Sequence, residues 1–439
     1  MCQGGWTINM PSNKNKDSPT HQRPNYNTEF LREPAKENSV FKDIRTILFI
    51  LKATGLLPIY KQLSNYEVGP PNKSHEFYSF FVRGVVHGLT IFNLYNLFKP
   101  GGSQLFYSYS ETDNINQWIE IILCVITYSA TVLICTKNSK SFLKIINEIL
   151  KVDEEVRRQF HATLSNNCEF SVKFIVGICI CQWYIIILKI ISATNQLTPT
   201  SYILIAFYAI QNGMSSIFII FAAALLRIVS MRFEYLNLVL NGYTYAQQRK
   251  ISKYWRRVGE NGAAAMETFP DISLFTYRMH NKLLRIYKSI NECCSLILVG
   301  YMGYAFYTIT TTAYNLFVQI TTNNISMNVL QWCLAWLCLH ISLLAILSKS
   351  CGQATREANT TSQILARVYG KSKEYQNIID KFLTKSIKQD VQFTAYGFFV
   401  IDNSTLFKIF SAVTTYLVIL IQFKQLEDSK MEDQIAAQT

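Results

Sequence analysis

Residues 405–423 read TLFKIFSAVTTYLVILIQF, and the length and apolar character of this stretch decide the fold. Nineteen residues of helix measure ~28 Å, which just crosses the hydrocarbon core of a bilayer. The residues immediately before it, Asp402, Asn403 and Ser404, together with Thr405 itself, offer several N-cap side chains. The stretch therefore predicts a membrane-spanning helix that begins near residue 404.

One face of this predicted helix is polar along most of its length. Counting back from Gln422 by four and three residues in turn gives Val418, Thr415, Ser411 and Lys408, of which only the valine is apolar. A polar stripe on an apolar span either packs against neighbouring helices or lines water. The lysine and the amide favour water, but the stripe by itself leaves both alternatives open.

Six further stretches are long and apolar enough to cross a bilayer. With the last one, the predicted spans cover residues 77–98, 117–136, 169–192, 201–231, 290–320, 327–348 and 404–423. The composition agrees, because 49% of the residues are hydrophobic and only 16% are charged, whereas about a quarter are charged in soluble domains. The sequence therefore predicts an all-α polytopic membrane protein with seven transmembrane helices.

Lysine and arginine are distributed very unevenly between the two sides of these spans. Residues 1–76, 137–168, 232–289 and 349–394 together carry 34 of them, against three in the alternate loops and the C-terminal tail. Because basic loops stay in the cytoplasm, we expect a cytoplasmic N-terminus and an extracellular C-terminus. The net charge of +13 then reflects membrane topology and not nucleic-acid binding. The sequon at Asn324 falls on the outer side and is a glycosylation candidate.

This topology also bears on the class of protein. It is the reverse of that of a G-protein-coupled receptor, and a carrier is disfavoured because the sequence lacks an internal repeat or paired broken helices. The eleven cysteines lie mostly within predicted spans, and the six histidines have no metal-ligand spacing. A phosphate-binding glycine loop and a nucleophile elbow are also missing from the sequence. We therefore expect no enzyme, no cofactor and no metal site.

The end of the last span resembles a known signature. The pattern TY-x5-QF, formed by Thr415, Tyr416, Gln422 and Phe423, is similar to the ending of insect gustatory receptors. Residues 351–365 (CGQATREANTTSQIL), which include Glu357, are similar to that family's sixth helix and following loop, and residues 392–407 (QFTAYGFFVIDNSTLF) to the run into its last helix. The final region also resembles the fructose-type branch. Insect odorant receptors share the architecture but generally lack this ending, and they remain an alternative.

The resemblance implies a ligand-gated cation channel in the plasma membrane of sensory neurons, passing monovalent and divalent cations. It implies a homotetramer, or a heteromer with related receptors, embedded in membrane lipid. The last helix of each subunit would line a central pore with Gln422 and Phe423 at the gate. The water-facing side would then consist of Lys408, Ser411, Thr415, Val418 and Gln422.

On this reading the chain has six parts. We expect a disordered cytoplasmic N-terminus (1–43), an interfacial amphipathic segment with a linker (44–76), a ligand-sensing bundle of six spans (77–348), a cytoplasmic anchor region (349–403), the pore-lining helix (404–423) and an extracellular tail (424–439). Within the anchor region, residues 372–387 form either a helix that contacts other subunits or a solvated amphipathic helix.

A tastant arriving from outside would bind in the outer halves of spans two to six. Aromatic faces with a few amides and hydroxyls suit a small polar molecule, such as a sugar or a bitter compound. The candidates are Trp183, Tyr184, Lys189, Tyr208, Gln211, Asn212, Tyr307, Tyr314, Gln331, Trp332 and Trp336, with Trp118, Glu120, Tyr202, Asn315 and Gln319 at similar depth.

Each candidate also has an ordinary structural interpretation. Tryptophan and tyrosine near the end of a span are common interfacial anchors. Lys189 either snorkels to the membrane surface or faces a hydrated cavity, where Glu120 is a possible partner. The sequence does not choose between these alternatives.

Overall fold

The computed structural model describes residues 47–58, 61–64, 67–70, 72–98, 111–160, 172–193, 199–256, 268–321, 327–369 and 391–438. The predicted disordered N-terminus (1–43), the sequon at Asn324 and the amphipathic stretch 372–387 lie outside these residues. The described part of the chain is almost entirely helical, with two short antiparallel hairpins.

Each of the seven predicted spans lies within one long helix, apart from residues 169–171, which fall outside the described residues. This confirms the all-α fold. The helices are α2 (Lys73–Phe98), α3 (Glu111–Lys137), α5 (Val172–Ala193), α6 (Pro199–Arg256), α7 (Thr268–Thr321), α8 (Met327–Tyr369) and α10 (Asn403–Gln438). The last helix continues well beyond residue 423, so the predicted outer tail is helical up to Gln438.

Five helices within the described residues are long and apolar enough to cross a membrane. They contain the stretches Ile115–Lys137, Ile205–Leu240, Phe275–Thr321, Met327–Thr361 and Asn403–Lys430. The helices α2 and α5 are not among these five. Which side of the membrane each end of the chain occupies stays a prediction from the distribution of basic residues.

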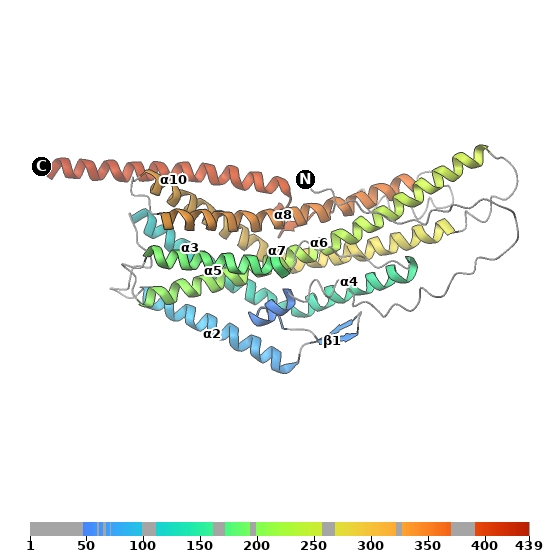
Figure 1. Cartoon of the computed structure of the whole chain (residues 1–439), viewed down its shortest axis with the longest axis horizontal. Coiled ribbons are helices and arrows are strands. Elements are labelled where there is room, and N and C mark those ends of the chain that lie inside the picture. The colour runs from blue at the N-terminus through green and yellow to red at the C-terminus, as the bar shows by residue number, and fades with distance from the viewer. Residues whose placement is uncertain are drawn as a thin grey trace. The chain divides into compact units, whose positions relative to one another are not determined.

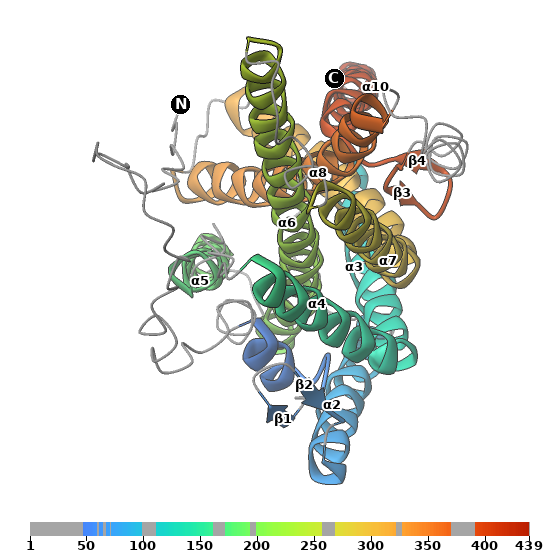
Figure 2. The ribbon, with the colours of Figure 1, turned by 90° about the vertical axis from the view of Figure 1, so that its right-hand side faces the viewer.

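Helix α6 lies in the middle of the bundle, with α10 at its edge (Figure 2). In α6, 89% of the most apolar window is buried, whereas the corresponding value for α10 is 6%. Small residues help α6 to take this place, because the side chains of Ala222 and Ala223 are fully buried and let neighbouring helices approach closely. Helices α6, α7 and α8 run side by side and continue past the ends of α3 and α10 (Figure 1).

Helix α4 (Ser139–Phe160) packs along this extension, where the sequence predicted only a cytoplasmic loop. Its buried residues Phe142, Ile145, Ile146 and Ile149 repeat at helical spacing and form one apolar face. The Phe142 ring lies 5.6 Å from the ring of Phe221 on α6. Because the opposite face is charged, the segment is too polar to register as a span, although its amphipathic pattern is clear.

Ahead of the first span, residues 47–58 begin with a helical turn and were predicted to be an interfacial amphipathic segment. Ile47, Leu48 and Leu51 are buried in the protein core. The Arg83 guanidinium on α2 donates hydrogen bonds to the carbonyl oxygens of Gly55 (2.6 Å) and Leu56 (2.8 Å). Packing within the protein therefore accounts for much of the apolar face of this segment.

Two hairpins connect helices to one another. In the first, β1 (Lys61–Ser64) pairs with β2 (Glu67–Gly69), and the Asn147 side chain of α4 bonds both the N–H and the carbonyl of Val68 at 2.8 Å. In the second, β3 (Thr394–Ala395) pairs with β4 (Phe399–Val400) directly before α10. Its turn contains Tyr396 and Gly397 at φ 50° and 78°, so a side chain at residue 397 would be strained.

Candidate functional site

Three helices are joined by a chain of hydrogen bonds. It lies in the half of the bundle that contains the C-terminal end of α2 and the N-terminal end of α8. The Tyr208 hydroxyl on α6 donates to the Glu120 carboxylate on α3. The same hydroxyl lies 2.9 Å from the Tyr304 hydroxyl on α7. A carboxylate in an apolar span is costly, and bonds of this kind lower that cost.

Aromatic rings from α6, α7 and α8 pack around this chain. The Tyr208 ring lies 6.0 Å from that of Trp336, which stacks on Trp332 at 6.4 Å. His340 lies one turn beyond Trp336 on the same face of α8, with 4.9 Å between their ring centroids. Its ring also lies 5.6 Å from Tyr304 and 6.5 Å from Tyr301. We call Tyr208, Tyr301, Tyr304, Trp332, Trp336 and His340 the aromatic cluster.

The aromatic cluster contains buried polar atoms that nothing in the described part of the chain satisfies. His340 is fully buried, and neither of its ring nitrogens has a hydrogen-bond partner there. The same holds for Trp336 Nε1, and for Oδ1 of Asn212, one turn from Tyr208 on α6. Because a buried polar atom without a partner costs ~1–3 kcal/mol, several within about one turn of one another are unusual.

Further amides and hydroxyls surround the aromatic cluster. The Tyr307 hydroxyl donates to Asn116 Oδ1 at 3.0 Å, which joins α7 to α3. The Gln211 amide donates to the Thr90 hydroxyl, which joins α6 to α2. Gln182 of α5 approaches α6 at Gly213. A Cβ added to this glycine would lie 3.1 Å from the Gln182 amide oxygen.

The structure sorts the sequence-predicted ligand residues into three groups. Tyr208, Trp332 and Trp336 lie in the aromatic cluster, and Gln211, Asn212 and Tyr307 lie beside it. Tyr314 and Gln319 are buried further along α7, while Trp183, Tyr184 and Gln331 are exposed on the single chain. Nothing is described of the Lys189 side chain, and Glu120 bonds Tyr208.

Tyr301, Tyr304 and His340 were not among the sequence-predicted ligand residues. His340 had a usable signal, since Trp332, Trp336 and His340 repeat at intervals of four on one helix face. The two tyrosines had none, because nothing local indicates which of the many tyrosines of α7 face α6 and α8.

The predicted stripe on α10 points away from the rest of the chain. Lys408, Ser411, Thr415, Val418 and Gln422 are all exposed, as is Phe423. Val413 on the opposite side is buried, and the Tyr416 ring lies 5.5 Å from Phe306 on α7. The stripe therefore does not pack against any helix within the described part of the chain.

Two asparagines fix the start of α10 to the helices that carry the aromatic cluster. Asn291 on α7 accepts a hydrogen bond from the Thr394 N–H at 3.1 Å and donates one to its hydroxyl at 3.4 Å. Asn359 on α8 accepts from the Val391 N–H at 3.2 Å and donates to the Val391 carbonyl at 3.3 Å. We call Asn291, Asn359 and the β3–β4 segment 391–400 the clasp.

From the clasp the chain passes directly into the first turn of α10. The Asp402 carboxylate accepts bonds from the Ser404 hydroxyl at 2.7 Å and the Thr405 N–H at 3.0 Å. These bonds, led by that of Ser404, lower the pKa of Asp402 from its ordinary value, although partial burial opposes them. The carboxylate therefore remains ionised at neutral pH and caps the helix.

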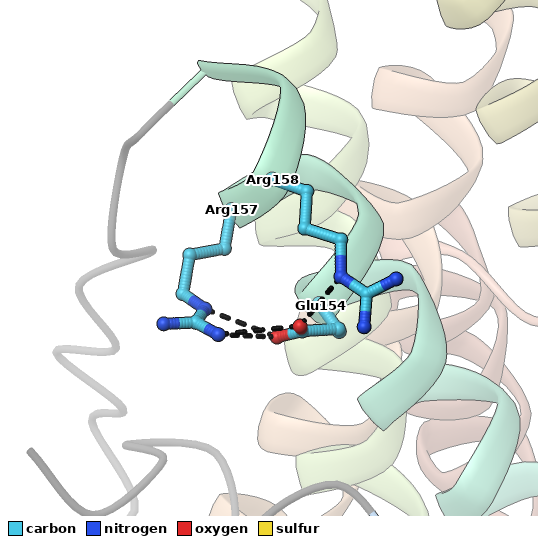
Figure 3. Close-up of polar contacts among 3 residues, drawn as sticks. All are labelled: Glu154, Arg157 and Arg158. Carbon is cyan, nitrogen blue, oxygen red and sulfur yellow. Dashed lines mark hydrogen bonds and ion pairs between the residues drawn. The ribbon is translucent and has the colours of Figure 1, made fainter. Parts of the chain in front are cut away.

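Charged side chains tie α4 to α6 and α7 at the far end of the bundle. The Arg232 guanidinium on α6 donates two bonds, at 3.0 and 2.9 Å, to Asp153, and both side chains are buried. Lys282 on α7 lies 2.6 Å from a Glu155 oxygen. Glu154, between these two acids, instead bonds Arg157 and Arg158 of its own helix (Figure 3).

Glu357, which belongs to the recognised pattern of residues 351–365, joins α8 to α6. The Asn237 amide on α6 donates to the Glu357 carboxylate at 3.0 Å and to its carbonyl at 3.1 Å. This glutamate is thus part of the packing between the two helices. No group of His, Cys, Asp or Glu suited to a metal ion occurs among the residues that the structure describes.

Comparisons with known proteins agree with one another. The 7tm chemosensory receptor family matches residues 44–427. The chain is 63% identical to the gustatory and pheromone receptor 32a of Drosophila melanogaster over the full length of both chains. It is 38% identical to gustatory receptor 68a of the same fly over 74% of this chain and 80% of that one. The fold is similar to that of the insect olfactory receptor OR5 from Machilis hrabei, with a TM-score of 0.56 at 13% identity, covering 88% of this chain and 99% of that one.

Proposed function

Because the chain belongs to the 7tm chemosensory receptor family, we propose that it is a gustatory-type receptor channel opened by a small molecule that binds at the aromatic cluster. Its relatives are named as receptors, and the chain is accordingly a multi-pass membrane receptor and not an enzyme. The kind of tastant stays a prediction, as do the odorant-type alternative and the place of the receptor in sensory neurons.

The observation that carries the proposal is that the aromatic cluster and the clasp share two helices. Helix α7 carries Tyr304 in the first and Asn291 in the second, and helix α8 carries Trp336 and Asn359 in the same way. A molecule that inserts among rings already in contact separates α6, α7 and α8. The clasp then passes that movement of α7 and α8 to the start of α10.

The exposed surface of α10 supports an assembly of several subunits. Its most apolar window is only 6% buried in the single chain, and its polar stripe has no partner helix among the residues that the structure describes. Lipid covers an apolar face without cost, but the polar face of such a span needs water or other polar groups. In the tetramer that the family resemblance implies, the stripes of four α10 helices surround a common water-filled path. The Gln422 amides then meet in water.

Current in cells that express only this chain tests the proposal. A gustatory ligand panel applied to such cells is expected to evoke a cation current, and Trp336→Ala is expected to shift the agonist concentration-response curve at least tenfold. Trp183→Ala is the matched control, because Trp183 is 61% exposed and outside the aromatic cluster. An equal shift in the two variants, at equal surface expression, would place the ligand elsewhere. The absence of current with any ligand would argue against a homomeric channel.

A further inference from the structure

His340 and Trp336 carry buried polar atoms that indicate the chemistry of the ligand. Both are at least nine-tenths buried, and neither His340 Nδ1, His340 Nε2 nor Trp336 Nε1 has a hydrogen-bond partner among the described residues. Asn212 is 1% exposed and its Oδ1 atom is in the same situation. A folded chain that carries such atoms gains free energy from any molecule that satisfies them.

These atoms lie within about one helical turn of one another along the bundle. Helices α6 and α8 run in the same direction, and Tyr208 and Trp336 contact each other across them. Asn212 and His340 each follow by four residues, one turn further along their helices. Helix α7 runs in the opposite direction to α6 and α8 (Figure 1). Tyr301, which precedes Tyr304 on α7, therefore lies on the same side of Tyr304 as His340 does of Trp336, and it contacts His340. Asn212 and His340 therefore lie one turn beneath the hydrogen-bonded pair Tyr208 and Tyr304, and Trp336 lies beside that pair. We call Asn212, Trp336 and His340 the polar level.

The chemistry of this level defines what it can bind. A neutral imidazole offers one donor and one acceptor, an indole N–H is a donor, and an amide oxygen is an acceptor. A hydroxyl group or an amide group supplies both a donor and an acceptor and so matches this set. The rings of Tyr301, Tyr304 and Trp336 surround these polar groups, and they favour contact with the apolar part of a ligand.

We propose that His340 and Trp336 bind the hydroxyl or amide group of an otherwise apolar ligand, whose body lies among the rings of the aromatic cluster. This inference rests on the proposed function, because it takes the aromatic cluster to be the ligand site. It predicts that sugars are not preferred ligands, since His340, Trp336 and Asn212 can pair with only a few of the many hydroxyls of a sugar.

Matched pairs of probes test the inference. Menthol, borneol and benzamide are compared with menthane, bornane and toluene, with sucrose as a polyol. Binding is followed by the thermal shift of the purified full chain, and activation by current in expressing cells. The polar member of each pair is expected to bind at least fivefold more tightly than its hydrocarbon partner, and sucrose is expected not to bind.

His340→Phe keeps a ring of similar size and removes both nitrogens. Because it also removes two unsatisfied polar atoms, we expect undiminished expression and thermal stability, with the fivefold preference lost and hydrocarbon binding unchanged. His340→Gln restores a donor and an acceptor and should recover part of the preference. A loss of stability in His340→Phe, a preserved preference, or no binding of any probe to the wild-type chain overturns the inference. Binding with the expected preference but without current would leave it standing and refute a homomeric channel instead.

Discussion

The clasp makes a quantitative prediction about gating. Asn359→Ala removes two hydrogen bonds to the backbone of Val391, a residue that is only 8% exposed. At about 1 kcal/mol each, the loss is ~2 kcal/mol. The coupling between α8 and α10 cannot exceed the free energy of the contacts that carry it. The agonist-evoked ratio of open to closed channels is therefore expected to fall by up to ~30-fold, since 1.4 kcal/mol is a factor of ten.

The assay must separate gating from binding and from expression. We expect the maximal current per surface receptor to fall in Asn359→Ala, while the thermal shift produced by ligand is unchanged. Thr360→Ala is the matched control, because the Thr360 hydroxyl donates to the Arg356 carbonyl of its own helix and joins no second helix within the described part of the chain. Asn291→Ala on α7 should resemble Asn359→Ala. Wild-type maximal currents in both clasp variants would refute the route through the clasp.

Three further predictions concern topology, the pore and stability. An antibody tag after Thr439 should be accessible on intact cells and an N-terminal tag inaccessible; the opposite labelling would invert the topology. Gln422→Ala should change the ion selectivity or resting current at normal surface expression, whereas reduced expression with unchanged permeation would mean that the amide packs against another subunit. Asp153→Ala should destabilise the chain by about 3–5 kcal/mol because it removes the carboxylate that pairs with the buried Arg232 guanidinium, and a thermal melt of the double variant with Arg232→Met should recover much of that loss.

The sequence predicted the helices well because span length and apolar content are local properties. It did not predict α4, since an amphipathic helix that packs on protein is too polar to be recognised by the test for a span. It named Tyr208 and Trp336 but not Tyr304, because the contact joins residues 96 positions apart and depends on the rotation of three helices.

Trp183 and Tyr184 were predicted to contact ligand but are exposed on the single chain. In a soluble protein two neighbouring aromatic residues within an apolar helix would be expected to face the core. In a bilayer the lipid is as apolar as the core, so composition does not distinguish an inward from an outward face. Both side chains are at least half exposed on the single chain. The polar stripe of α10 could be recognised from the sequence, because polar residues in a span must face water or other polar groups and not lipid.

The length of α8 explains how events at the aromatic cluster could reach α10 without a chain of rearranged side chains. His340 and Asn359 belong to one uninterrupted helix and lie 19 residues apart. That separation is ~28 Å of helix, so a tilt of about 5° at the aromatic cluster moves the clasp by roughly 2 Å. Movements of this size at helix contacts are sufficient to switch packed proteins between states. Two glycines at exposed positions of α8 between His340 and Asn359 would make this helix bend. We then expect the receptor to bind ligand without opening.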